Sequence, residues 1–270
     1  MKTAVIVLAL IALASAAPKA TKLSYRNLYK QPIKTITNPS PRIIGGREAT
    51  PHSIPWQAFL EVYSSSEGWY CGGSLISANY VVTAGHCGDG ARQAYVTLGA
   101  HNINQNEDTQ VEIESDDIKV HERYDGDEII NDIAVIGLPQ AVSLNDAVNT
   151  VDLPSANDGD FAGETATASG WGLTDGHGNS ISDTLNEVDL KVISNRDCEE
   201  IFGSLESSIL CTSGDQNTGT CSGDSGGPLA IGKTLIGITS FGVQYCPGGY
   251  PSAFTRVTSF VSWLQSNTDV

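Results

Sequence analysis

Three short stretches of this sequence hold residue types that together could perform nucleophilic catalysis. His86 ends the segment TAGH and is followed by Cys87, Asp132 begins an apolar run, and Ser225 lies in the glycine-rich segment 223–228, GDSGGP. A serine hydroxyl is a weak nucleophile at neutral pH, and it becomes reactive when a neutral imidazole accepts its proton. A buried carboxylate can fix the tautomer of that imidazole and stabilise the imidazolium. The three stretches therefore predict a nucleophile, a base and an orienting acid.

Each stretch also has a structural interpretation when it is taken alone. A histidine beside a cysteine is commonly structural, and an aspartate before an apolar run commonly caps or turns the chain. A glycine-rich segment with a serine is often only a turn. The glycines would nevertheless allow backbone N–H groups near Ser225 to point at one position, where an oxyanion could be stabilised.

The elements that must position these residues are predicted to be β-strands. Short apolar runs are separated by clusters of Gly, Asn, Asp and Ser at spacings typical of an all-β sandwich or barrel. Examples are 56–62, 80–83, 94–98 and 234–239. One helix is predicted near the C-terminus over 258–265, with Thr258 as its cap. The polar segment 155–163 is the predicted join between two β units.

The N-terminal region is expected to be removed from the mature protein. Lys2, the apolar run from Ala4 to Ala14 and small residues after it have the layout of a secretory signal peptide, assigned to residues 1–16. The run is too short to span a bilayer, so we expect no membrane anchor. Residues 17–42, with four prolines, are interpreted as a propeptide, and residues 43–270 as the functional domain. We therefore expect a secreted, extracellular protein.

Charge is distributed unevenly along the chain. Residues 1–42 contain no Asp or Glu, so residues 43–270 carry all 31 acidic side chains against eight Lys and Arg, a formal net charge of −23. Such a surface repels nucleic acids and anionic membranes, and neither is expected as a partner. The simplest interpretation is an acidic surface that keeps a secreted protein soluble.

The cysteines indicate disulfides. Six cysteines all follow residue 70, and an even number in an oxidising compartment predicts three bonds, although the spacing leaves 15 connectivities open. The alternative is a zinc site, but the chain contains no CxxC pair. We expect no metal ion and no cofactor.

The motifs in their order resemble the chymotrypsin-like serine proteases of the trypsin superfamily. The resemblance runs from Ile43 to about Gln265 and is nearest to invertebrate chymotrypsins and collagenolytic digestive proteases. Its motifs are IIGG from residue 43, CGGSLI at 71–76, TAGHC at 83–87, NDIAV at 131–135, SGWG at 169–172, GDSGGP at 223–228 and SFG at 240–242. It implies an all-β fold of two six-stranded antiparallel β-barrels, with the active site between them and a C-terminal helix.

The same resemblance implies how the catalytic residues and cysteines are used. His86, Asp132 and Ser225 would form the catalytic triad, with the backbone N–H groups of Gly223 and Ser225 as the oxyanion hole. The implied disulfides are Cys71–Cys87, Cys198–Cys211 and Cys221–Cys246.

Activation is implied in the same way. Cleavage between Arg42 and Ile43 would free an ammonium group on Ile43, which would pair with Asp224 and order the oxyanion hole. Because cleavage follows a basic residue, a separate trypsin-like protease is expected to activate the precursor.

A substrate pocket is implied beside Ser225. The matched positions place Gly219 at its base and Thr220, Gly242 and Ser252 on its walls, while Ser240 and Phe241 complete the substrate-binding residues. An uncharged, open pocket favours large apolar or aromatic side chains before the scissile bond. Because Gly219 also occurs in broad-specificity relatives, an elastase-like or collagenolytic protease is the alternative.

Other interpretations and partners follow from the same residues. A catalytically inactive homologue that binds partners is one rival, but such proteins usually lack a triad residue. A regulatory cascade protease is another, but it usually carries additional disulfide-bonded modules. A monomeric digestive enzyme with peptide and protein substrates is preferred, and protein protease inhibitors are the remaining class of partner considered.

The segment 98–110 resembles the calcium loop of the family, but Ala100 and Gln110 replace two carboxylates, so no tight calcium site is predicted.

Overall fold

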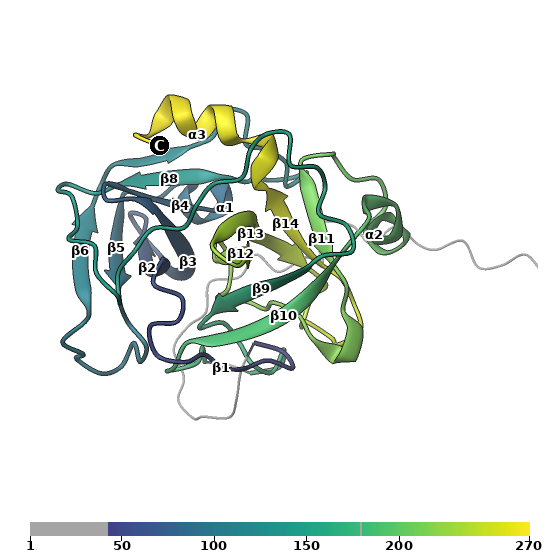
Figure 1. Cartoon of the computed structure of the whole chain (residues 1–270), viewed down its shortest axis with the longest axis horizontal. Helices are drawn as coiled ribbons and strands as arrows, with labels where there is room; N and C mark the ends of the chain where they lie inside the picture. Colours follow the sequence, from purple (N-terminus) through teal and green to yellow (C-terminus); the bar gives the residue numbers. More distant parts are fainter. Residues whose placement is uncertain (1–42, 179) are drawn as a thin grey trace, which may run out of the picture.

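The computed structural model describes residues 43–178 and 180–270. The predicted signal peptide, the predicted propeptide and Arg42 lie outside the described residues. Within the described part, strands form two seven-stranded sheets, and every pairing between named strands is antiparallel. The sheets occupy two halves of the molecule (Figure 1), and the first half precedes the second along the chain except for residues 47–48, which pair with the second sheet.

The first half is a curled sheet in the order β6-β5-β2-β3-β4-β8-β7. In β5, buried and more exposed residues alternate, and Ala94, Val96 and Leu98 are fully buried, whereas β8 is buried along its whole length. No pairing in the described residues joins its two end strands. The strands are β2 (Gln57–Tyr63), β3 (Gly68–Ser77), β4 (Tyr80–Thr83), β5 (Gln93–Leu98), β6 (Val111–Ser115), β7 (Ile118–Val120) and β8 (Ala134–Gly137).

The second half is a closed barrel. Its sheet runs β1-β10-β11-β14-β13-β12-β9, and an additional pairing of β9 with β10 closes six strands and leaves β1 outside the ring. The strands are β1 (Arg47–Glu48), β9 (Thr165–Gly170), β10 (Asn186–Ile193), β11 (Ile209–Thr212), β12 (Pro228–Ile231), β13 (Thr234–Gly242) and β14 (Ser252–Arg256). The predicted all-β fold of two antiparallel β-barrels is confirmed in its architecture. Within the described residues, the second half closes as a barrel of six strands, whereas the first half is a curled sheet whose ends do not pair.

Three short α-helices accompany the sheets in the part of the chain that the structure describes. They are α1 (Gly85–Gly88), α2 (Asn195–Phe202) and the C-terminal α3 (Val261–Asn267). The predicted C-terminal helix is confirmed, but Thr258 does not cap it, because Val257–Ser259 form a 3₁₀ turn and Phe260 precedes the helix. In Figure 1, α3 lies over the first half although the chain reaches it from the second, and Trp263 Nε1 in α3 donates to the Glu122 carboxylate at 3.0 Å.

The predicted join lies between the two halves, whereas each disulfide lies within one half. The predicted join 155–163 lies in the connection from β8 to β9, where the Arg256 guanidinium donates to the Asp160 carbonyl at 2.9 Å. The structure contains the three disulfides that the resemblance implied, Cys71–Cys87, Cys198–Cys211 and Cys221–Cys246. The first attaches α1 to β3, and the last attaches the segment before Ser225 to the chain after β13.

Candidate active site

His86 and Asp132 meet at the inner edge of the first half. His86 lies in α1, directly after β4, and Asp132 lies two residues before β8, which pairs with β4. One oxygen of Asp132 lies 2.9 Å from Nδ1 of His86, and the other accepts the backbone N–H of His86 at 2.7 Å. These contacts fix both the orientation of the imidazole ring and the position of the chain that carries it.

Asp132 is fully buried but well supplied with hydrogen bonds. The Ser240 hydroxyl donates to Oδ2 at 2.6 Å, and the Thr255 hydroxyl donates to the backbone carbonyl of Asp132 at 2.6 Å. Burial opposes ionisation of the carboxyl, but the neighbouring imidazole and the hydrogen bonds from His86 and Ser240 outweigh it and lower the pKa of Asp132. The side chain is therefore held as a carboxylate.

Ser225 comes from the second half, in the turn that leads into β12. Its backbone carbonyl accepts the N–H of Gly72 in β3 at 2.7 Å, which holds this turn against the sheet that carries His86. Gly226 has φ +78°, and a Cβ there would lie 2.1 Å from Thr83 Oγ1, so only glycine allows this approach. Within the described residues, no hydrogen bond joins the Ser225 hydroxyl to His86.

The backbone around Ser225 leaves two donors free. Among the described residues, the N–H groups of Gly223 and Ser225 donate no hydrogen bond, whereas those of Asp224, Gly226 and Gly227 all do. Two unused N–H groups on either side of Asp224 are what an anionic oxygen would require.

Asp224 itself points into the protein. Its carboxyl is fully buried and accepts the N–H of Gly172 at 2.8 Å and that of Cys221 at 2.9 Å. No Lys, Arg or His of the described chain pairs with it. Burial raises the pKa of Asp224 to about 7, although the two hydrogen bonds act in the opposite direction. Ile43 is also fully buried, in an apolar cluster with Val188 and Leu190.

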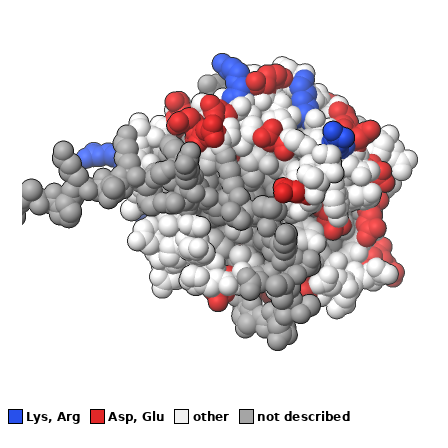
Figure 2. Space-filling view, turned by 180° about the vertical axis from the view of Figure 1, so that it is seen from behind, with Lys and Arg blue, Asp and Glu red and all other residues white. Residues whose placement is uncertain are grey.

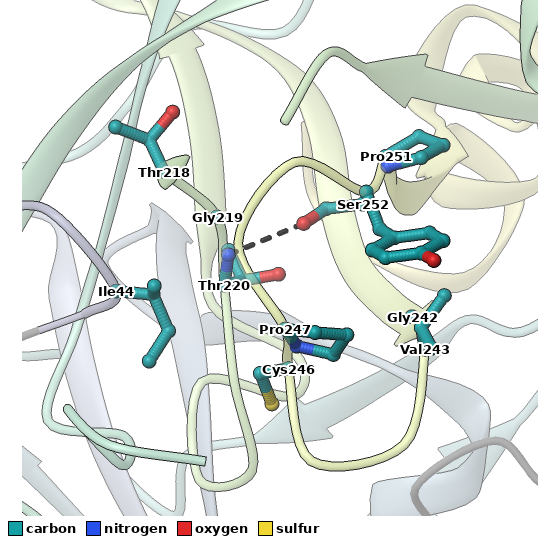
Figure 3. Close-up of a pocket in the computed structure, with 11 residues that line it drawn as sticks. Ile44, Thr218, Gly219, Thr220, Gly242, Val243, Cys246, Pro247, Pro251 and Ser252 are labelled. Atoms are coloured by element: carbon teal, nitrogen blue, oxygen red, sulfur yellow. Dashed lines mark hydrogen bonds between the residues drawn. The ribbon is translucent and has the colours of Figure 1, made fainter. Parts of the chain in front are cut away.

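A pocket lies beside residues 218–220, just before the turn that carries Ser225, and Figure 3 shows its lining. Gly219, Thr220, Gly242 and Ser252, which the sequence placed there, all line it. The Thr220 backbone N–H donates to the Ser252 hydroxyl at 3.2 Å, which ties the two walls together. None of the lining residues in the described chain carries a charge. Besides the four residues named above, the lining consists of Ile44, Thr218, Val243, Cys246, Pro247, Tyr250 and Pro251.

The structure places the two remaining substrate-binding candidates outside this pocket lining. Ser240 is buried with its hydroxyl on Asp132, and Phe241 is buried with its ring against Phe202 at a centroid distance of 5.3 Å. The sequence analysis missed three contributions: Ser240 and Thr255 as supports of Asp132, and Ile44 as part of the pocket. Each depends on a contact between segments far apart in the sequence, and no local motif signals it.

Two clusters resemble metal sites but do not fit a metal ion. The ligand atoms of Cys71, His86 and Cys87 lie close together, but the two sulfurs are joined in a disulfide and cannot bind as thiolates. In the segment 98–110, the Glu107 carboxylate accepts the N–H groups of His101 and Asn102 and the side-chain amide of Gln110. The Glu107 oxygens therefore already accept hydrogen bonds from this chain, whereas the calcium loop of the family would need them free to bind the ion.

The charged side chains on the face seen from behind are mostly acidic. Figure 2 shows Asp and Glu side chains spread over that face, with far fewer Lys and Arg. None of the helices in the described residues is long and apolar enough to cross a membrane.

Comparison with known proteins gives a consistent family. The model of the family described as Trypsin matches residues 43–264. Brachyurin of Leptuca pugilator is 48% identical over 229 residues, covering 84% of this chain and 99% of the relative. Chymotrypsin of Phaedon cochleariae is 41% identical over 274 residues, covering 100% of this chain and 99% of the relative.

Solved structures agree in fold. A structure of HL collagenase superposes with a TM-score of 0.77 at 33% identity and covers 84% of this chain and 99% of that one. A structure of GrC has the same TM-score at 35% identity, with 84% and 100% covered. The resemblance seen in the motifs therefore extends through nearly the whole of residues 43–270.

Proposed function

The chain belongs to the trypsin family of serine proteases, and we propose that it is a secreted endopeptidase that cleaves after large uncharged side chains. It is made as a precursor, and cleavage after Arg42 activates it. Three disulfides in the described residues suit an oxidising compartment. The substrates are peptides and proteins, and the acidic surface makes nucleic acids unfavourable partners.

The catalytic step follows from the proton positions around His86. Because Asp132 Oδ2 can only accept, the proton lies on Nδ1, and Nε2 is left with its lone pair. Nε2 takes the proton of Ser225 Oγ as that oxygen bonds to the substrate carbonyl carbon. The carbonyl oxygen becomes an oxyanion and receives the free N–H groups of Gly223 and Ser225.

The second half of the reaction uses the same groups. His86 gives its proton to the leaving amine, and the carbon–nitrogen bond breaks to leave an ester on Ser225. Water then gives a proton to Nε2 and attacks the ester, and the acid product leaves as Ser225 regains its proton. The missing Ser225–His86 hydrogen bond is compatible with this scheme, because such contacts often tighten only when substrate binds.

The proposed specificity rests on one observation, the absence of charge in the described lining of the pocket. The described lining offers no carboxylate to a substrate Lys or Arg, and a buried unpaired cation would be costly there. Gly242 and Ser252 add little bulk to the walls, so large apolar side chains such as Phe, Tyr, Leu and Trp are favoured. A filled apolar pocket discriminates by only about 1–3 kcal/mol, so the preference is expected to be graded.

A collagenolytic or elastase-like activity is the second candidate. The similarity to the HL collagenase structure favours it. It differs from the first candidate in the range of side chains accepted and not in the reaction.

Activation is proposed to depend on Asp224. In the uncut chain this buried carboxyl has no cation among the described residues, and burial raises its pKa to about 7. Cleavage after Arg42 would supply the ammonium group of Ile43 as its partner. Since the uncharged pocket would reject arginine, a separate trypsin-like protease is the expected activator.

A panel of chromogenic peptides tests the proposal. The peptides differ only in the residue before the scissile bond, and the trypsin-treated protein is repurified before assay. We expect cleavage after Phe, Tyr, Leu and Trp and at least about 100-fold lower kcat/KM after Lys or Arg. The Ser225→Ala variant, treated in the same way, is the control for residual trypsin. Preferred cleavage after Arg, absent from that control, would contradict the proposed specificity.

A further inference from the structure

The chain just after the proposed activation site is paired with the base of the pocket. Ile44 and Gly219 form an antiparallel bridge, in which the Gly219 N–H donates to the Ile44 carbonyl at 3.1 Å. The next residue, Gly45, has φ +70°, and a Cβ there would lie 2.8 Å from the Asn217 carbonyl oxygen. The segment therefore runs in close contact with residues 217–219.

The base of the pocket has no side chain of its own. A Cβ on Gly219 would meet only the Ser252 hydroxyl, at 3.1 Å, and no other atom within 4 Å. Ile44 is one of the residues that line the pocket. In Figure 3 it lies on one side of the Thr218–Thr220 segment, with Ser252 and Pro247 on the other.

We propose that Ile44 is a specificity-determining residue that closes the deep end of the pocket where Gly219 leaves it open. This inference rests on the proposed function, since it concerns which side chain the same pocket accepts. The branched apolar side chain of Ile44 limits the length of the substrate side chain and offers it an apolar surface. A longer or bulkier substrate side chain gains room when Ile44 is shortened, whereas a short one loses contact.

The backbone bridge adds a second consequence. Ile44 is the second residue after the proposed cut, and its carbonyl holds the Gly219 N–H. Any shift of Ile43 on cleavage would therefore act on Gly219 through this bond. The same residue therefore connects the activation segment to the pocket independently of Asp224.

The experiment compares Ile44→Ala and Ile44→Val with Ile43→Val in the trypsin-activated protein. Ile43→Val is the matched control, because it removes one methyl group from the adjacent residue, which is buried and does not line the pocket. Active sites are counted by burst titration, and kcat/KM is measured for peptides with Trp, Phe or Leu before the scissile bond.

We expect Ile44→Ala to raise the ratio of kcat/KM for Trp over Leu by about fivefold or more, since one or two methylene groups in an apolar pocket change selectivity by that order. Ile44→Val should shift the ratio in the same direction by about twofold to threefold. Ile43→Val should change all three peptides together.

The inference would be overturned if Ile44→Ala has countable active sites and its ratio of kcat/KM for Trp over Leu equals that of the wild type. If Ile44→Ala yields no active sites, the ratio in Ile44→Val decides in its place. Failure of the proposed function is a separate result, since the wild-type protein would then cleave none of the three peptides.

Discussion

The carboxylate of Asp132 holds His86 at two points, through Nδ1 of the ring at 2.9 Å and through the backbone N–H at 2.7 Å. The first contact selects the tautomer whose Nε2 can accept a proton, and the second ties α1 to the segment just before β8. Because Asp132 is fully buried, water does not compete for either contact. The proposed base is therefore positioned before any substrate arrives.

Replacing the carboxylate should remove this control of the tautomer. In Asp132→Asn, the amide can donate to Nδ1 and leave the proton on Nε2, where it blocks proton transfer. We expect kcat on a peptide substrate to fall by about 10⁴-fold at neutral pH. A loss of less than about tenfold, with the fold intact by circular dichroism, would show that His86 does not depend on Asp132.

Ser240 should support catalysis through Asp132 without contacting the reacting atoms. Its hydroxyl donates to Oδ2 at 2.6 Å, and a hydrogen bond to a charged group contributes about 1.5–3 kcal/mol. Ser240→Ala should lower kcat by about tenfold with little change in KM, and it should shift the acid limb of the kcat profile. Thr212→Val removes a buried hydroxyl elsewhere in the barrel and should leave kcat and its pH profile unchanged. Equal effects of the two variants would refute the positioning role.

The uncut precursor should lose stability as pH rises. The pKa of Asp224 is raised from 3.8 to about 7 in the fold, so between these values the unfolded chain releases a proton that the folded chain retains. The free energy of unfolding should therefore fall by up to about 4 kcal/mol from pH 4 to pH 7. Urea unfolding of the precursor should show this decline, and Asp224→Asn should largely remove it. An equal decline in the variant would exclude Asp224 as its source.

His121 should give the opposite pH dependence. Its Nδ1 accepts the Arg123 N–H at 3.1 Å, and its ring packs against Phe260 and Trp263 near α3. Burial lowers its pKa, with Arg123 assisting and Glu122 opposing. Below about pH 6.5 the unfolded chain gains a proton that the folded chain resists, so stability falls with falling pH until the folded pKa is passed.

The variant His121→Phe separates packing from titration. It keeps an aromatic ring against α3 but cannot be protonated, so its melting temperature should depend less on pH between 6.5 and 5 than that of the wild type. A steeper dependence in the variant would contradict the assignment.

The sequence predicted the parts of the site that local motifs carry, and it missed those that distant pairings create. The segments around His86, Asp132 and Ser225 each contain a recognisable pattern, and the family resemblance implies four pocket positions, which are located by matching from Cys221 and Ser240. The contact of Ser240 with Asp132 spans 108 residues, and that of Thr255 spans 123. Nothing local to either residue indicates such a partner.

The same distinction explains the differences in the fold. Short apolar runs predicted strands because the pattern is local, whereas closure of the second half requires β9 to pair with β10 across an intervening loop. Thr258 has the residue type of a helix cap. However, β14 ends at Arg256 and Thr258 lies in the 3₁₀ turn that follows it, so the helix begins later. Tertiary contacts therefore override the local capping preference.

The central claim is that Ser225 is the nucleophile of an active protease. The most direct measurement is labelling of the trypsin-activated, repurified chain with a phosphonofluoridate, followed by peptide mapping. We predict one label per chain, on Ser225, a loss of peptidase activity in proportion to labelling, and no label on Ser225→Ala. A label on another residue, or peptidase activity that persists in Ser225→Ala, would contradict the account.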